Sequence, residues 1–180
     1  MAYDLEQLKV LVVEDNEYMR GLVRRLLYAL GVRGIREVSN GEEAIAQLEH
    51  FTPDLVLTDW LMEPGDGLEL TRYLRTSPDS PDAYVPVIMM TGYSAKPQVI
   101  QARDAGVTEF LAKPISVKTL CERIISVIET PRPFVRTKTF FGPCRRRHTW
   151  SNYMGPERRC GEDSSDRSEE MELDRLLGSL

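Results

Sequence analysis

The sequence lacks the features that mark membrane-spanning and disulfide-stabilised proteins. It has no run of about 18 apolar residues, so we expect no membrane insertion. Its first ten residues, MAYDLEQLKV, lack the apolar stretch of a secretion signal. Its three cysteines, Cys121, Cys144 and Cys160, are an odd number at spacings that match no disulfide framework. These absences indicate a chain that works in the reducing cytoplasm.

Histidine and cysteine are also too scarce for a structural zinc site. Cys144, His148 and Cys160 lie near one another in the sequence, but they supply three ligands where a structural zinc site needs four. The other histidine, His50, is far away in the sequence. We therefore expect no zinc.

Positive charge is scarce in most of the chain and concentrated in one segment. The formal net charge is −5 at pH 7. Residues 1–130 hold 13 Lys/Arg and 20 Asp/Glu, residues 131–160 hold 8 and 1, and residues 161–180 hold 2 and 7. A local basic patch attracts anions more strongly than the mean charge suggests, so residues 131–160 are the candidate anion-binding segment.

Residues 8–130 alternate between short apolar runs and amphipathic stretches. The runs LKVLVVED, GIREVS, PDLVLTDW, VPVIMMTGY and VTEFLAKP predict five strands. Between and after them, apolar residues at helical spacing predict helices over 17–30, 41–51, 66–74, 96–105 and 117–128. Because the strands are continuously apolar, they predict an α/β fold with a doubly wound, five-stranded parallel sheet covered on both faces.

Polar residues close four of the predicted strands, at the edge where such sheets bind ligands: Glu14 and Asp15, Asp59, Thr91, and Lys113. Three carboxylates at one rim repel one another, which a hard cation such as Mg²⁺ relieves. Asp59 is placed to act as a nucleophile toward a phosphoryl group. A hydroxyl and an ammonium group beside it would bind the transferred phosphoryl oxygens.

Residues 6–130 resemble the CheY-like receiver domains of two-component response regulators, which have a flavodoxin-like fold. The resemblance rests on VVEDN, LTDWLMEPGDGLEL, MMTGY and FLAKP. It implies that Asp59 accepts phosphate from a histidine kinase and that Glu14 and Asp15 hold Mg²⁺ with it. It also implies that Thr91 and Lys113 contact the phosphate.

The same resemblance implies two further features near the site. Phe110 falls where receivers keep a rotating aromatic switch, and Lys113-Pro114 falls where they have a cis peptide bond. The sequence departs from the receiver pattern at Glu63, where a proline is usual, with Pro64 one place later. That departure affects the loop beside the metal and leaves the ligands unchanged.

An enzyme is the competing interpretation of the receiver motif. Aspartate-nucleophile phosphatases also use Mg²⁺ and an aspartate after a strand, but they place a second acid two residues later, where this chain has Leu61. We therefore expect no enzymatic activity. No output domain of recognisable size follows residue 130, so we expect the protein to act by binding other proteins.

The basic segment, PRPFVRTKTFFGPCRRRHTWSNYMGPERRC, repeats a Gly-Pro step followed by arginines. Each Gly-Pro step fixes a bend that would present the arginines after it. The residues of interest are Arg145, Arg146, Arg147, Arg158 and Arg159, with Trp150 and Tyr153 between the two groups. Guanidinium forks match phosphates and the O6 and N7 atoms of guanine, and aromatic rings stack on bases. A small ligand with two phosphates and two guanines, cyclic di-GMP, has this chemistry.

Receiver and basic segment together resemble the Cle proteins, CheY-like regulators whose arginine-rich extension binds cyclic di-GMP. The resemblance rests on FFGPCRRR, the intervening Trp and Tyr, and YMGPERR. It implies nucleotide contacts from the seven residues named above, with Arg132 and Arg136 as further candidates. It also implies action at the flagellar motor switch protein, recruitment to the flagellar pole, and control of motility and surface attachment.

The alternative is a plain phosphorelay receiver whose basic arm binds nucleic acid or another partner. Acidic residues on both sides of the arm disfavour a long polyanion. The sequence thus predicts a receiver over 1–130, bounded by TPRPF, and a mostly irregular, arginine-rich segment over 131–165. A short amphipathic helix is predicted over 166–180.

Overall fold

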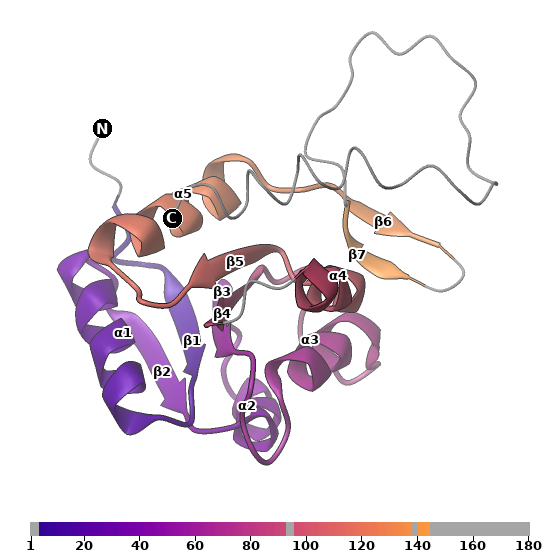
Figure 1. Ribbon diagram of the computed structural model, residues 1–180, viewed down its shortest axis with the longest axis horizontal. Helices are drawn as coiled ribbons and strands as arrows, with labels where there is room; N and C mark the ends of the chain where they lie inside the picture. The colour runs from indigo at the N-terminus through magenta and orange to yellow at the C-terminus, as the bar shows by residue number, and fades with distance from the viewer. Residues whose placement is uncertain (1–3, 93–95, 138–139, 145–180) are drawn as a thin grey trace, which may run out of the picture. The chain divides into compact units, whose positions relative to one another are not determined.

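Five parallel strands form the central sheet of the protein (Figure 1). The computed structural model describes residues 4–92, 96–137 and 140–144. The strands lie in the order β2-β1-β3-β4-β5, which confirms the predicted flavodoxin-like, doubly wound fold. Their bounds are β1 (Lys9–Val13), β2 (Gly34–Val38), β3 (Leu55–Asp59), β4 (Val87–Thr91) and β5 (Glu109–Ala112).

Helices follow the strands and cover both faces of the sheet (Figure 1). The helices of the described region are α1 (Glu17–Ala29), α2 (Gly41–Leu48), α3 (Gly67–Thr76), α4 (Lys96–Ala105) and α5 (Val117–Glu129). Among the described helices, none is long and apolar enough to cross a membrane.

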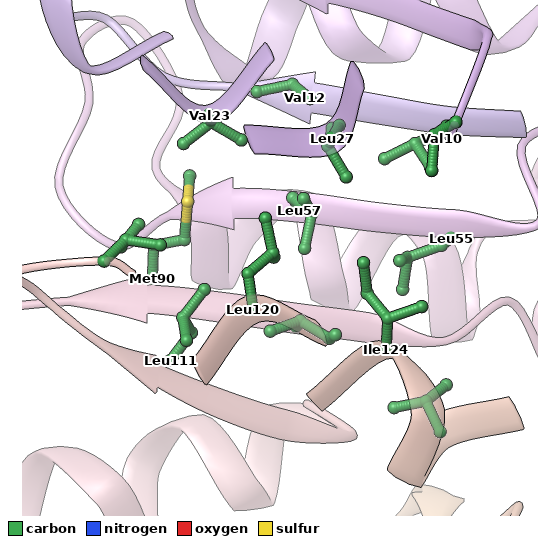
Figure 2. Packing of buried hydrophobic residues seen from close by; sticks show 14 of the residues in the cluster. Val10, Val12, Val23, Leu27, Leu55, Leu57, Met90, Leu111, Leu120 and Ile124 are labelled. Atoms are coloured by element: carbon green, nitrogen blue, oxygen red, sulfur yellow. The ribbon is translucent and has the colours of Figure 1, made fainter. Parts of the chain in front are cut away.

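One face of the sheet packs against α1 and α5. Val23 and Leu27 of α1 meet Leu120 and Ile124 of α5 over the strand side chains, among them Leu57 (Figure 2). All five side chains are fully buried. Burying a side chain of this size contributes about 1.5–3 kcal/mol, so this layer holds the two helices firmly on the sheet.

The opposite face packs against α2, α3 and α4. Leu48 of α2 and Leu74 of α3 lie with Leu11 and Val56 of the strands in one cluster. A smaller cluster beside it joins Met89 of β4 to residues of α4 and of the loop after β3. With both faces covered, the sheet can bind ligands only at its edges and ends.

Local signals set where the helices begin. Asn16 accepts a hydrogen bond from the Met19 amide at 3.1 Å, which starts α1 directly after the first strand and its acidic pair. Asp66 and Glu69 form a capping box at the start of α3, which satisfies amides that have no partner inside the helix. The helices therefore begin just beyond the carboxyl ends of the strands.

A short β-hairpin follows α5, within the segment that the sequence predicts to be mostly irregular. β6 (Phe134–Arg136) pairs antiparallel with β7 (Phe141–Pro143). Strands of three residues are too short to show a period-two pattern, and β7 contains Gly142 and Pro143, which disfavour strands. The compact unit that contains the receiver extends through Cys144. The helix predicted over 166–180 lies outside the described residues.

Candidate functional site

The strand register brings the predicted site residues to one edge of the sheet. Val13 pairs with Thr58, and Asp59 pairs with Met90. Thr91 pairs with Ala112 on the neighbouring strand. The predicted site residues therefore lie at or just after the carboxyl ends of their strands, at nearly the same level of the sheet: Glu14, Asp59, Thr91 and Lys113.

Three carboxylates converge at this edge. One ligand oxygen from each of Glu14, Asp15 and Asp59 lies within 4.8 Å of the other two. Glu14 is 1% exposed, Asp59 is partly buried and Asp15 is exposed, so the cluster opens toward solvent at Asp15. Carboxylate oxygens with one open side match a magnesium ion, which binds few protein ligands and keeps several waters.

Lys113 bridges two of these carboxylates. Its Nζ lies 2.9 Å from Glu14 Oε2 and 3.0 Å from Asp59 Oδ1. Burial lowers the pKa of Lys113, but the hydrogen bonds to Glu14 and Asp59 and the charges of both carboxylates outweigh it and raise the pKa. The ammonium is therefore charged at neutral pH and offsets the repulsion between the acids.

Burial also acts on Glu14. It raises the pKa of the Glu14 carboxyl, and the charge of Asp59 adds to the rise, against the hydrogen bond from Lys113. The backbone fixes this residue firmly, because its amide donates to Val38 O at 3.2 Å and its carbonyl accepts from Arg20 Nη1 at 2.6 Å. The contact of Arg20, in the first turns of α1, could not be predicted from the sequence, because the local pattern does not show which way its side chain points.

Asp59 is held by the loop that follows it. The Trp60 amide donates to Asp59 Oδ1 at 2.8 Å. At the start of α3, a Cβ on Gly67 would overlap the carbonyl oxygen of Asp59, so only glycine lets the helix approach this closely. Gly67 is a site-supporting residue that sequence reasoning missed, although its position directly after the cap residue Asp66 was a usable signal.

An open hollow lies beside the carboxylates. It is lined by Asp59, Trp60, Leu61, Gly92 and Lys113. The hollow opens the Asp59 carboxylate to solvent next to the Lys113 ammonium.

The two predicted switch positions lie next to this hollow. Thr91 is buried at the end of β4, and its carbonyl accepts a hydrogen bond from the Lys113 amide at 2.8 Å. Phe110, on β5, is partly buried and packs with Trp60 and Met89. The Lys113-Pro114 bond is cis, as the receiver resemblance implies, and the Glu63-Pro64 bond is also cis.

Two of the candidate nucleotide contacts, Arg132 and Arg136, lie among the described residues. Arg132 Nη2 lies 3.8 Å from Glu109 Oε1, which gives this arginine a partner within the receiver. Arg136 is exposed, and its guanidinium lies 4.3 Å from the centroid of the Phe141 ring. The remaining candidates lie outside the described residues: Arg145, Arg146, Arg147, Trp150, Tyr153, Arg158 and Arg159.

Comparison with known proteins supports the assignment of this edge. The family described as response regulator receiver domain matches residues 10–125. Chemotaxis protein CheY-3 of Vibrio cholerae is 33% identical over 124 residues, which cover 69% of this chain and 94% of that protein. Chemotaxis protein CheY of Pseudomonas aeruginosa is 33% identical over 122 residues, covering 68% and 97%.

A solved structure adds a comparison at the site. The receiver domain of a sensor histidine kinase from Pseudomonas aeruginosa matches with a TM-score of 0.58 at 28% identity, over 66% of this chain and 94% of that one. That structure contains a magnesium ion coordinated in its active-site cleft.

Proposed function

Because the chain belongs to the response regulator receiver domain family, we propose that it accepts a phosphoryl group on Asp59 and binds Mg²⁺ through Glu14, Asp15 and Asp59. The arrangement of charge supports this most directly. Three carboxylates lie within 4.8 Å of one another, and the Lys113 ammonium touches Asp59 at 3.0 Å. The single positive charge of Lys113 does not balance three carboxylates, and a divalent cation would neutralise the remaining negative charge.

The chain's own residues account for the transfer step. An Asp59 oxygen attacks the phosphorus, a new O–P bond forms, and the N–P bond to the histidine of a kinase breaks, leaving the electron pair on that nitrogen. Lys113, already hydrogen-bonded to Asp59, then donates to a phosphoryl oxygen. Thr91 would bind another of these oxygens. A bound magnesium ion supplies charge neutralisation for the phosphoryl oxygens.

Incubation with an acyl phosphate and Mg²⁺ tests the phosphoacceptor. The intact protein should gain one phosphoryl group by mass spectrometry, and Asp59→Asn should gain none. Asp66→Asn is the matched control, because Asp66 is a nearby carboxylate engaged in capping α3. Equal labelling of Asp59→Asn and the unmodified sequence would contradict the assignment.

We propose further that residues 132–160 bind cyclic di-GMP and that the protein acts as an adaptor rather than as an enzyme. The two Gly-Pro-arginine repeats and the aromatic residues between them support this. Together they supply bidentate donors for phosphates and guanine edges and flat surfaces for the bases. Ligand binding would order the segment and change what the protein presents to its target.

Calorimetric titration with cyclic di-GMP tests this proposal, with GTP and a short single-stranded oligonucleotide as controls. Arg145→Ala and Arg158→Ala should each weaken binding at least about tenfold, because charge-assisted hydrogen bonds contribute about 1.5–3 kcal/mol. Arg72→Ala, which removes an exposed arginine of α3, should leave the affinity unchanged. Unchanged affinity in both variants of the basic segment would contradict the site.

The same titration addresses the alternative of a nucleic-acid-binding arm. Comparable binding of all three ligands, weakening steeply with salt, would favour that arm over a selective nucleotide site.

The partner we propose is the flagellar motor switch protein, reached at the flagellar pole. Identity of 33% to two chemotaxis proteins supports a target in motility. Capture of the purified motor switch protein by the immobilised chain, with and without cyclic di-GMP, tests the partner. Absence of binding in both states would remove it.

A further inference from the structure

The buried arginine of α3, Arg75, holds together three segments that are distant in the sequence. Its side chain is 4% exposed. Nε donates to Gly106 O at 3.1 Å and Nη1 donates to Ala83 O at 2.9 Å. Burial lowers the pKa of the guanidinium to about 10, so it is still charged at neutral pH. The negative charge of Asp82 opposes this fall in the pKa. The guanidinium donates its hydrogen bonds to backbone carbonyls, and burying a charge is costly unless its surroundings compensate for it.

Arg75 also contacts the hairpin. Its guanidinium carbon lies 5.1 Å from the centroid of the Phe134 ring. Nη2 has no hydrogen-bond partner in the part of the chain that the structure describes. Phe134 also packs with Tyr84 at 5.0 Å and with Phe141 at 5.5 Å between ring centroids. The charged group is thus stabilised by the aromatic cluster of which two rings belong to the hairpin.

Glycines let the hairpin backbone lie directly on the turn between α4 and β5. Gly106 has φ +99°, and a Cβ there would come 2.9 Å from Arg75 Cγ. A Cβ on Gly142 of β7 would come 3.0 Å from Gly106 Cα. A larger residue at Gly142 would push the hairpin away from this turn, and a larger residue at Gly106 would displace the Arg75 side chain.

A second anchor holds the segment between α5 and the hairpin. Glu109, the first residue of β5, is buried. Its carboxylate lies 3.9 Å from Arg123 Nη1 of α5 and 3.8 Å from Arg132 Nη2. The Cys144 amide donates to Pro133 O at 2.7 Å and closes the base of the hairpin.

We propose that Arg75, Gly106 and Glu109 form a seat for residues 132–144, and that the seat positions the arginine-rich segment for nucleotide binding. The positioning role rests on the proposed cyclic di-GMP function. Arg145 follows Cys144 directly in the sequence, so a fixed hairpin fixes the point from which that segment starts. A segment with one end fixed loses less conformational entropy when a ligand orders it. Arg75 and Phe134 are then positioning residues that need touch no ligand.

Phe134→Ala is the decisive variant, because it removes the contact from the hairpin side and leaves the receiver core intact. Arg75→Lys is the complementary change: it keeps the charge, but its single nitrogen replaces the two that bind Gly106 O and Ala83 O, and it has no planar group to stack on a ring. Phe134→Tyr keeps the ring and should behave as the unmodified protein. Tyr18→Ala, which removes a ring that is 92% exposed on α1, is the control.

Three measurements on the full chain read out the proposal. Hydrogen exchange should show faster exchange of the hairpin amides, including that of Cys144, in Phe134→Ala and Arg75→Lys. Cyclic di-GMP affinity should fall about threefold to tenfold, the effect of ordering one or two further side chains. Mg²⁺ affinity should not change, since the carboxylate edge uses other residues.

The outcomes separate the seat from the nucleotide function. If the unmodified protein binds no cyclic di-GMP, the nucleotide function and the positioning role both fail, while hydrogen exchange still decides whether the seat exists. If it binds and Phe134→Ala binds equally well despite lost hairpin protection, the positioning role is overturned and the nucleotide function stands. Hairpin amides that exchange equally fast in the unmodified protein and in Phe134→Ala overturn the seat.

Discussion

Replacing Lys113 by methionine should destabilise the protein, and Mg²⁺ should restore most of the loss. The change keeps the length of the side chain and removes the only positive charge that, among the described residues, contacts the carboxylates of Glu14 and Asp59. Glu14, at 1% exposed, would then be a buried carboxylate facing a second carboxylate.

The contact distances set the size of the effect. At 2.9 and 3.0 Å and an effective dielectric constant of about 20, each contact is worth about 5–6 kcal/mol before desolvation. The dehydration of the ammonium and carboxylates cancels much of this, and removing one partner of a buried pair typically costs about 3–5 kcal/mol. Because Lys113 keeps 22% of its side-chain exposure, we expect a loss near the lower end, about 3 kcal/mol.

The effect of Mg²⁺ distinguishes the loss of a positive charge from a general packing defect. A divalent cation among Glu14, Asp15 and Asp59 replaces the missing positive charge. The stability difference between Lys113→Met and the unmodified protein should therefore shrink by more than half at saturating Mg²⁺. With one positive charge fewer at the site, Lys113→Met should also bind Mg²⁺ more tightly.

Urea unfolding followed by far-ultraviolet circular dichroism at pH 7 measures these differences, once with a chelator and once with Mg²⁺. Lys118→Met is the control. The Lys118 side chain is 84% exposed, and its Nζ lies 4.0 Å from Glu122 Oε1, a surface ion pair that contributes little to stability. An equal loss of stability with and without Mg²⁺ would refute the electrostatic account of the site.

Two further predictions address the independence of the two sites and the packing of the core. Asp59→Asn should leave cyclic di-GMP affinity within about twofold by calorimetry, because the proposed ligand contacts use other residues; abolished binding would contradict the two-site picture. Leu27→Ala should lower the free energy of unfolding by about 2–5 kcal/mol, because the side chain is fully buried between α1 and the sheet. The exposed Tyr18→Ala is its control in urea unfolding, and equal losses in the two variants would mean that the α1 packing is misassigned.

The sequence predicts the receiver and its carboxylate edge because those signals are local. Each inner strand is a continuous apolar run, and the polar residue that ends the run marks the edge where the strands meet. The helix predicted over 17–30 is α1, Glu17–Ala29, because the cap residue Asn16 and the terminal glycine Gly31 are both readable from their neighbours.

The hairpin and its seat could not be predicted in this way, because their stabilising contacts are distant in the sequence. Phe134 is bound by Arg75 and Tyr84, and neither shows in the pattern around residue 134. The resemblance to the Cle proteins also named Arg132 as a further candidate nucleotide contact, and the pairing of this arginine with Glu109 could not be seen in the sequence. Composition cannot separate an arginine used by the fold from one presented to a ligand.

The hairpin seat limits how such an extension can be gained by, or moved to, another receiver. Appending residues 131–180 to a different receiver would supply Phe134, Phe141 and Gly142, but it would not supply the receiver residues that they contact. The recipient would need an arginine at the end of its third helix, a glycine in the turn before its last strand and an acid at the start of that strand. A fusion to a receiver without these residues would attach the extension but would not orient it. A truncation after residue 130 would remove the hairpin rings that contact Arg75 and Tyr84.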